Sequence, residues 1–408
     1  MIHRYLVKNA NVMSVFDGSL KKTDILVEDG IVTKTAPGIT ASVEEIIDAE
    51  GLTVTPGWVD IHAHIYYDGI GLGIDPQMYL LPKGVTYAVD PGTSGADNFA
   101  DFRRYVRWCT DLKYKSYLNI AKIGVPIMGY ELTDMGNLDK DACKRVFRDF
   151  AGELLGLKVR VTSNMCKDPK AALSAVRELC DELHTTFCVH ATRCSLSTEE
   201  ILGFMKKGDV FTHSYAKTDS GILDKDGSIK AGVREARERG VIFDMGHGIN
   251  SFAFDVAKKA IDQGFELDAI STDLHVSDVD GPVYDMPTTI SKFLCLGVSL
   301  EKAIQLATSN PVKLLALSDK LLEIKPGEKA DFTAFLVERG DFRYTDCDKC
   351  ELSGNMRLVS KFTCVGRKIF TPRKVTGKNR PIGIAAIEAA NKPPTVETTP
   401  PRTNKVIA

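Results

Sequence analysis

The sequence predicts an α/β fold in which a TIM-like (β/α)8 barrel carries a small β-sandwich domain built from both chain ends. Short apolar strands alternate with helical stretches from residue 53 to about 315, which is typical of βα units and a parallel sheet. Strand-like alternation flanks this region on both sides. A length of 408 residues suits one large barrel and a second, smaller domain. The predicted domains are 1–55 with 318–373 for the composite β domain, 56–317 for the barrel, and 374–408 for a tail.

The N-terminal residues 1–52 alternate apolar and polar side chains, as half-buried strands do. Strands are expected at 5–12, 24–28 and 30–34, and Glu28-Asp29-Gly30 is a hairpin-turn sequence. Pro56-Gly57 marks the boundary with the next region. This segment therefore supplies the first part of the β domain.

Eight short apolar segments are expected to form the barrel strands. They are residues 53–59, 84–90, 116–120, 156–161, 186–190, 209–213, 241–245 and 268–273. Two of the intervening helices have clear start signals. Pro169 follows Asp168 at the favoured first helical position, and Ser197 with Glu200 matches a capping box. Eight strand–helix units over this length predict a (β/α)8 barrel, followed by two helices near 288–296 and 300–309.

Strand patterning returns between residues 328 and 372. Strands are expected at 331–337 and 362–365, where they would pair with the N-terminal strands. From about residue 375 the chain is rich in Lys, Pro, Thr and Asn and has little to bury. This tail is expected to be disordered.

Composition limits the classes of partner. Charged residues make up 26% of the chain and hydrophobic residues 44%, as in ordinary globular proteins, and the net charge is −2. This balance gives no electrostatic case for nucleic acid or an anionic membrane, and no apolar run reaches the ~18–20 residues that span a bilayer. The ten cysteines are scattered, so we expect them to be reduced, in a cytoplasmic protein without a signal peptide. A small-molecule substrate is the expected partner, and association into a homo-oligomer through the outer helices stays open.

The sequence His62-Ala63-His64 ends the first predicted barrel strand. In extended chain Asp60, His62 and His64 point to one side, which makes the two imidazoles a ready pair of ligands for a metal such as zinc. Taken alone, this spacing is more often a surface pair without a role. The strand and the Pro-Gly entry, together with partners further along the chain, favour a metal site.

These partners are ionisable residues at the carboxyl ends of the later strands. They are Lys158 on strand four, His190 after strand five, His213 after strand six, His247 after strand seven and Asp273 after strand eight. The carboxyl ends of barrel strands converge on the face that holds barrel active sites. With His275 counted, six of the eight histidines belong to this group, and only His3 and His184 fall outside it.

Lys158 is the unusual member of the group, since a lysine within Gly-Leu-Lys-Val is expensive to bury as a cation. One interpretation is a snorkelling or salt-bridged lysine. The other is an amine carbamylated by carbon dioxide, which becomes an anionic group able to bridge two metals.

Several stretches resemble the amidohydrolase superfamily, close to its dihydroorotase and hydantoinase branch and, more narrowly, to its deacetylase metallohydrolases. They are Pro56-Gly-Trp-Val-Asp-Ile-His-Ala-His64, Gly156-Leu-Lys-Val-Arg160, His190, Thr212-His213-Ser214-Tyr215, Asp244-Met-Gly-His-Gly248, Ser271-Thr-Asp273, Thr308-Ser-Asn-Pro-Val-Lys313 and Ile324-Lys-Pro-Gly-Glu-Lys-Ala-Asp331. The resemblance covers residues 3 to about 370 and leaves the tail outside.

The resemblance implies a dinuclear metal centre. His62 and His64 would bind the more buried ion with Asp273, and His190 and His213 would bind the other. Carbamylated Lys158 and a hydroxide would bridge the two ions. The ligand set suits Zn²⁺, with Mn²⁺ as the alternative. Two such ions lower the pKa of a shared water, so that hydroxide exists near neutral pH and attacks the substrate carbonyl. Asp273 is then placed to pass a proton to the leaving group.

Three further residues are candidates for contacts with the substrate. Arg160 shares a strand face with Lys158 and could grip a carboxylate in a bidentate fork, although a salt bridge within the barrel is as plausible. His247 sits in a Gly-His-Gly turn, where small neighbours let a ligand approach. His275 follows Asp273 by two residues and is expected to face the substrate or to support a ligand.

The sequence therefore predicts a dinuclear metal-dependent hydrolase that cleaves a small acyl ester or amide, such as an acetylated hydroxy acid or an N-acyl amino acid. A cyclic amidase of the dihydroorotase or hydantoinase type is the alternative. A mononuclear deaminase would leave Lys158 without a role. A non-catalytic scaffold is least expected, because such chains typically lose ligands and here the whole set is present.

Overall fold

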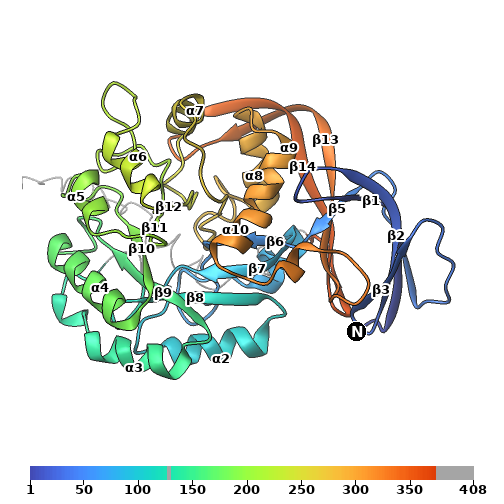
Figure 1. Ribbon diagram of the computed structural model, residues 1–408, viewed down its shortest axis with the longest axis horizontal. Helices are drawn as coiled ribbons and strands as arrows, with labels where there is room; N and C mark the ends of the chain where they lie inside the picture. The colour runs from blue at the N-terminus through green and yellow to red at the C-terminus, as the bar shows by residue number, and fades with distance from the viewer. Residues whose placement is uncertain (126–129, 374–408) are drawn as a thin grey trace, which may run out of the picture.

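The computed structural model describes residues 1–125 and 130–373. Two sheets organise this part of the chain (Figure 1). One is a curled parallel sheet in the order β12-β11-β10-β9-β8-β7-β6, and the other is a mostly antiparallel sheet in the order β15-β14-β13-β5-β1-β2-β3, with β4 on β1. The predicted fold class is confirmed: a (β/α)8 barrel carries an additional sheet formed by both ends of the described chain. The expected disordered tail, 374–408, lies outside the described residues.

The parallel sheet contains seven strands. They are β6 (Trp58–Asp60), β7 (Val85–Asp90), β8 (Lys113–Asn119), β9 (Leu154–Arg160), β10 (Thr186–His190), β11 (Val210–Phe211) and β12 (Ile242–Phe243). The eighth expected strand, 268–273, is reduced to two parallel bridges, Asp244 with Ala269 and Ala63 with Leu274. These bridges close the barrel because one contacts the segment after β12 and the other the segment after β6.

The barrel helices lie outside the strands, where Figure 1 shows α2 to α6 along the outer side. The helices are α1 (Pro76–Tyr79), α2 (Phe99–Cys109), α3 (Lys140–Phe150), α4 (Pro169–Leu183), α5 (Thr198–Gly203), α6 (Ala231–Glu238), α7 (Phe254–Asp262), α8 (Met286–Cys295), α9 (Leu300–Leu306) and α10 (Ser309–Leu314), with short 3-10 turns at Leu81–Lys83, Met135–Asn137 and Asp319–Leu322. Both predicted start signals are confirmed: Asp168 caps α4 and Ser197 with Glu200 forms the capping box of α5. None of the helices in the described ranges is long and apolar enough to cross a bilayer.

The second sheet contains β1 (Arg4–Met13), β2 (Leu20–Glu28), β3 (Ile31–Ala36), β4 (Glu45–Asp48), β5 (Thr53–Pro56), β13 (Asp331–Thr345), β14 (Glu351–Val365) and β15 (Lys368–Phe370). The hairpin turn between β2 and β3 forms at Asp29 and Gly30, both with positive φ. A buried core of Tyr5, Val7, Ile25, Phe332 and similar side chains lies within this sheet, separate from the barrel core. The exact domain boundaries at 55/56 and 317/318 stay a prediction.

The expected strand 53–59 is divided between the two sheets. β5 pairs with β1 and β13, whereas β6 pairs with β7 of the barrel. The residue between them is Gly57, and a Cβ at this position would collide with the Thr86 side chain. The chain therefore crosses from one sheet to the other at the one residue that leaves room for it.

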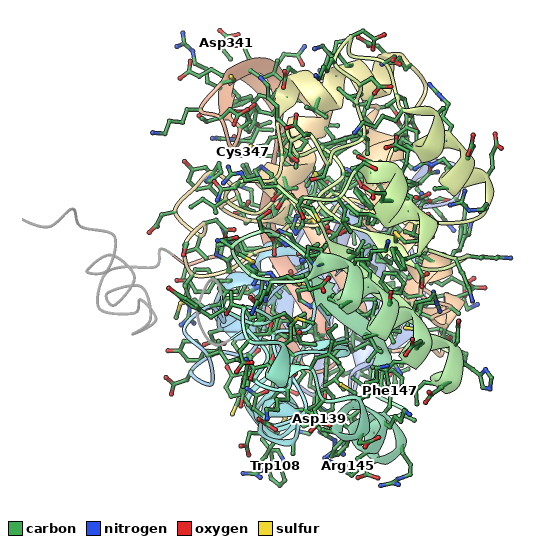
Figure 2. All side chains as sticks on the ribbon, turned by 90° about the vertical axis from the view of Figure 1, so that its left-hand side faces the viewer. Trp108, Asp139, Arg145, Phe147, Asp341 and Cys347 are labelled. Carbon is green, nitrogen blue, oxygen red and sulfur yellow. The ribbon has the colours of Figure 1, made fainter. Side chains whose placement is uncertain are left out.

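The C-terminal hairpin is much longer than expected. β13 and β14 have 15 residues each and arch from the small sheet over the barrel to α7 (Figure 1). In Figure 2 Asp341 lies at one end of the molecule and Trp108 at the other, and Cys347 of the hairpin tip lies further in, nearer to Asp341. The extension was not predicted because its outer half is polar and half-exposed. Its inner side packs on α8, where Leu358 N donates to Ser291 Oγ over 2.9 Å.

Candidate active site

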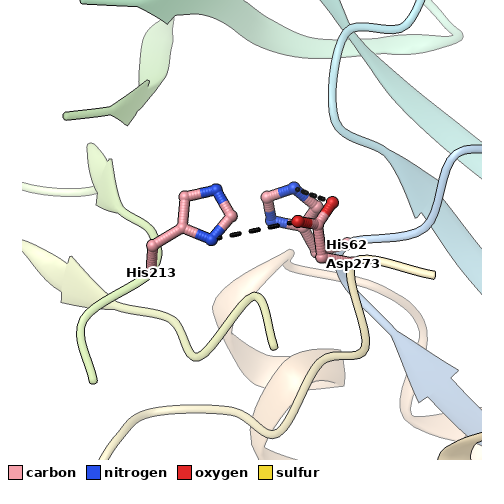
Figure 3. A group of neighbouring side chains, drawn as sticks. All are labelled: His62, His213 and Asp273. Carbon is pink, nitrogen blue, oxygen red and sulfur yellow. Dashed lines mark ion pairs between the residues drawn. The ribbon is translucent and has the colours of Figure 1, made fainter. Parts of the chain in front are cut away.

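Three of the predicted ligands form a compact cluster at the carboxyl ends of the barrel strands. The ligand atoms of His62, His213 and Asp273 all lie within 4.8 Å of one another, and all three side chains are buried. Figure 3 shows the Asp273 carboxylate beside the His62 ring, with ion pairs drawn to it from both imidazoles, which come from different parts of the barrel. His62 follows β6, His213 follows β11, and Asp273 belongs to the closing segment.

His62 is oriented by a carboxylate behind it. Its Nδ1 lies 3.2 Å from Asp244 Oδ2, and its Nε2 lies 3.2 Å from Asp273 Oδ1. Asp244 is 1% exposed and also accepts hydrogen bonds from Thr212 Oγ1 and Ser271 Oγ, over 2.6 and 2.5 Å. Because Asp244 needs donors, the His62 proton is held on Nδ1, which leaves the Nε2 lone pair directed at the centre of the cluster.

His64 is oriented in the same manner through a hydroxyl group. Thr93 Oγ1 donates to Asp90 Oδ2 over 2.7 Å, so it must accept from His64 Nδ1, which lies 2.6 Å away. His64 Nε2 then faces Asp273 Oδ1 at 3.1 Å with its lone pair free to bind. The two histidines of the His62-Ala63-His64 sequence therefore present equivalent nitrogens to one carboxylate oxygen.

His190 and His213 lie side by side, with ring centroids 4.1 Å apart. His213 donates Nδ1–H to Gly246 O over 2.7 Å, and its buried Nε2 has no hydrogen-bond partner among the described residues. His190 uses the other nitrogen, because its Nε2 lies 2.7 Å from Thr192 Oγ1. Each ring is thus fixed through one nitrogen and leaves the other for a further ligand.

Lys158 lies in the same cluster, near His62, His190 and His213, where its positive charge opposes protonation of each of these imidazoles. Its side chain is 2% exposed and its Nζ contacts Cys188 Sγ at 3.4 Å. Among the described residues no carboxylate forms an ion pair with it. The structure therefore holds a buried amine close to the imidazoles that forms no ion pair with a described acid.

Asp273 is held in place by unusual backbone geometry. Its φ is +51°, and a Cβ on Gly248 would collide with its Oδ2. Its backbone N donates to His62 O over 2.6 Å, and the preceding Thr272 donates through both N and Oγ1 to Asp60. Asp60 also accepts from His62 N over 3.2 Å, so this fully buried carboxylate ties the segment of Asp273 to the segment of His62.

The electrostatics follow from burial and from the mutual contacts. Burial opposes ionisation of Asp273, but His62, His64 and His213 outweigh it and hold the pKa of this carboxyl well below its usual range. Burial lowers the pKa of His213 to about 3 and that of His64 below its ordinary value. Burial also disfavours the cation of His62, but the Asp273 carboxylate raises the pKa of this imidazole.

The donor set fits divalent metal ions. Imidazole nitrogens and a carboxylate are ligands that zinc and manganese accept. The buried, unpartnered Nε2 of His213 and the convergence of two Nε2 atoms on Asp273 Oδ1 are the observations that support the fit. His62 and His64 each have a partner behind the ring that holds the proton on Nδ1 and leaves Nε2 facing Asp273, as ligating imidazoles usually have.

The cluster forms the floor of a cavity of about 580 Å³. Lys158, Arg160 and Thr162, alternate residues of β9 and its extension, line one wall. Cys347 and Asp348 of the hairpin tip line another part of the cavity. The tip is fixed by Asp346, whose carboxylate accepts from the backbone N–H groups of Asp348, Cys350 and Phe254 over 2.8 to 2.9 Å.

The three expected substrate contacts lie in different environments. Arg160 lines the cavity and its Nη1 donates to Glu131 Oε1 over 2.6 Å. His275 also lines the cavity, and its Nε2 lies 3.3 Å from Asp278 Oδ2 while burial lowers its pKa to about 4. His247 does not line the cavity.

His247 instead lies fully buried behind the cavity wall. Its Nε2 contacts Lys292 Nζ at 2.8 Å and its ring packs on Phe252. The glycines beside it leave room for neighbouring side chains, since a Cβ on Gly248 would meet Asp273. The small residues let the loop pack against Asp273 and the ring faces α8, so the expected contact of His247 with the substrate stays a prediction.

Several supporting residues were not found from the sequence. Asp244, Thr93 and Asp90 orient the histidines, Glu131 pairs with Arg160, and Lys292 contacts His247. A signal existed for Asp90 and Asp244, because both follow apolar strands as the expected ligands do. None existed for Glu131 or Lys292, which come from a loop and from the middle of α8.

The extended matches to known proteins include two curated relatives and a solved structure, together with a family profile. The amidohydrolase family profile matches residues 53–356. A deacetylase of Agrobacterium fabrum is 33% identical over 337 residues, which cover 80% of this chain and 82% of the relative. A deacetylase of Brucella anthropi is 30% identical over 367 residues, covering 88% and 90%. A crystal structure described as a dihydroorotase matches with a TM-score of 0.82 and 28% identity, covering 92% of this chain and 99% of the other.

Proposed function

Because the chain belongs to the amidohydrolase family and is a metal-dependent hydrolase acting on C–N or ester bonds, we propose that it removes a small acyl group from a hydroxy acid or an amino acid. The single observation that carries this proposal is the convergence of imidazoles, a carboxylate and a buried amine at the floor of one cavity. The two deacetylases to which the chain is similar support the acyl group as the part that is removed.

We assign the metal ligands as follows. His62, His64 and Asp273 would hold one divalent ion, and His190 and His213 would hold a second. Lys158, carbamylated at Nζ, would join the two sites, with Zn²⁺ the preferred metal and Mn²⁺ the alternative. When bound, such ions supply an activated water near neutral pH and polarise the carbonyl of the substrate.

The side chains of the protein would then hold the ligands in position and transfer the proton. The Asp273 carboxylate stays ionised because the neighbouring imidazoles hold its pKa low, so it is able to accept the proton of the attacking water. The same carboxyl group would deliver that proton to the departing oxygen or nitrogen. Asp60, Asp244 and Thr93 keep the ligands in one arrangement during these transfers.

A cyclic amidase is the second candidate, and the similarity to a structure described as a dihydroorotase favours it. A scaffold without activity is the least supported, since each residue of the proposed ligand set is present. Both candidates differ from the leading one in the substrates that they hydrolyse. A cyclic amidase opens ureide or imide rings, and a scaffold hydrolyses neither these rings nor acyl esters and amides.

A hydrolysis screen tests the proposal. Protein supplied with zinc or manganese and bicarbonate is assayed against O-acetylated hydroxy acids, N-acyl amino acids of both hands and cyclic ureides, with metal content measured in parallel. We expect about two metals per subunit and turnover of acyl esters or amides. Turnover of the ureides alone would replace the proposal by the cyclic amidase, and much less than two metals per subunit would contradict the dinuclear centre.

A further inference from the structure

We propose that the cavity contains a carboxylate-binding subsite formed by Arg193, Thr162 and Arg160. This inference rests on the proposed function and deepens it, because it limits the substrates to acylated acids whose free carboxylate lies against β9 and the loop after β10. Three observations support it. The guanidinium of Arg193 in the cavity lining is unpaired, Arg160 and Thr162 on β9 and its extension have buried polar atoms without partners, and Lys217, the other cation at the outer part of the cavity, already has an acidic partner.

Arg193 is the first observation. It lines the cavity as an exposed residue, and its guanidinium forms no hydrogen bond or ion pair with the residues that the structure describes. Its backbone is nevertheless fixed: φ is +55°, Arg193 N donates to Thr218 Oγ1 over 3.3 Å, and Arg193 O accepts from Ser163 Oγ over 2.8 Å. A left-handed conformation costs free energy for an arginine, so the surrounding loops impose this position.

Buried polar atoms on β9 and its extension are the second observation. Arg160 and Thr162 are 8% and 7% exposed, and both line the cavity. Arg160 Nε and Thr162 Oγ1 have no partner among the described residues, although Arg160 Nη1 donates to Glu131 Oε1. Burying unpaired donors is costly unless a ligand satisfies them. Glu131 acts as a positioning residue that holds the guanidinium plane of Arg160.

The charges around the outer cavity are the third observation. Lys217 also lines the cavity, but it pairs with Asp255 over 3.2 Å. Asp348 is the acidic residue of the hairpin tip in the same lining, and it lies near Lys217. Arg193 is therefore the one cation of this outer lining that has no acidic partner in the described chain. A guanidinium is suited to a planar carboxylate, which it binds through two parallel hydrogen bonds.

The test measures binding and turnover separately. Binding of 3-phenyllactate and of its uncharged N-methylamide is measured by calorimetry, with metal-loaded and chelator-treated protein. Turnover is measured with O-acetyl-3-phenyllactate and its N-methylamide. Variants Arg193→Gln and Thr162→Val remove the proposed donors, and Lys217→Gln is the matched control because it removes a cavity cation that already has a partner.

We expect the acid to bind at least about tenfold more tightly than the amide, as a charge-assisted hydrogen bond allows. Arg193→Gln should abolish most of this ratio and Thr162→Val should reduce it about threefold or more, while Lys217→Gln changes it less than about twofold. The subsite would be overturned if the acid and the amide bound equally, or if Arg193→Gln and Thr162→Val both left the preference for the acid unchanged. It would also be overturned if this preference disappeared only when the metal was removed with a chelator.

The two levels of the proposal fail in different ways. An Arg193-dependent preference for the acid without any hydrolysis of the acetyl ester would keep the subsite and reject the proposed function. If the wild type hydrolysed O-acetyl-3-phenyllactate and its N-methylamide with similar kcat/KM, the proposed function would stand and the carboxylate subsite would be rejected.

Discussion

His62 donates its Nδ1–H to Asp244 Oδ2 over 3.2 Å, although 182 residues separate the two. The contact joins the first and seventh strand ends across the barrel, and it decides which nitrogen of His62 faces Asp273. A carboxylate behind a ligating imidazole both fixes the tautomer and raises the basicity of the ligand. The stability of the metal centre should therefore depend on a residue that contacts no metal.

Replacing Asp244 by Asn tests this dependence. The amide is a weaker acceptor for His62 Nδ1–H, so we expect a loss of about 10–100-fold in metal affinity or activity. Metal affinity is measured by competition with a chelator and activity by kcat/KM. Ser271→Ala is the control, because it removes a donor to Asp244 and keeps the acceptor of His62. An equal effect of both variants would contradict the role of Asp244 as the acceptor.

Lys158→Ala tests the bridging role proposed for this amine. We expect loss of both metals and of turnover, because the variant removes the only amine of the cluster that could carry a carbamate. Cys188→Ser, which changes the neighbour of Lys158 Nζ, should retain most activity. Partial recovery of Lys158→Ala by added propionate would support the carboxylate-like role, whereas near-normal turnover without it would refute that role.

Asp273→Asn tests proton transfer. An amide cannot take up the proton of the attacking water, so kcat should fall about 10²–10⁴-fold even in protein that still holds metal. The measurement is kcat per bound metal across pH. Native turnover in a metal-retaining variant would remove Asp273 from the proton path.

Lys292 makes the folded state sensitive to pH. It is fully buried, and burial lowers its pKa to about 7, while His247, Asp346, Cys347 and Asp278 surround it. An unfolded chain therefore binds more protons than the folded one between about pH 7 and the ordinary lysine pKa, and the free energy of unfolding rises with pH in that window.

The comparison of wild type with Lys292→Met isolates this effect. Between pH 8 and 10 the wild type should gain on the order of 1 kcal/mol per pH unit relative to the variant. Denaturant unfolding at several pH values measures the difference. Parallel pH dependences of the two proteins would contradict the depressed pKa. His247 stays neutral throughout this range, because burial and Lys292 hold its pKa well below the ordinary value.

Asp346 holds the hairpin tip over the cavity, so Asp346→Ala should raise KM more than it lowers kcat. The variant leaves three backbone N–H groups without their acceptor, which should destabilise the fold by about 1–3 kcal/mol. Steady-state kinetics and denaturant unfolding measure the two effects. Asp348→Ala, which keeps the anchor, should leave stability within about 0.5 kcal/mol. An unchanged KM in Asp346→Ala would show that the tip does not shape the substrate site.

The sequence by itself determined the elements whose signals are local. The capping box at Ser197, the Asp168-Pro169 helix start and the turn at Asp29-Gly30 depend on residues a few positions apart, and all three formed as predicted. The alternation of strands and helices gave the barrel, and with it the convergence of the strand ends. That convergence brought His62, His213 and Asp273 together, because the fold places every strand end on one face.

The tertiary structure alone decided how these side chains are supported and which of them face the cavity. Periodicity says which side of a strand a residue takes, but not which distant residue meets it there. Arg160 contacts Glu131 from a loop, and His247 contacts Lys292 from α8. Both were predicted to contact the substrate, but Arg160 lines the cavity and His247 lies behind its wall. The long hairpin reaches the cavity because packing on α8 stabilises a strand that is polar along its outer face, and such packing between distant segments leaves no local pattern in the sequence.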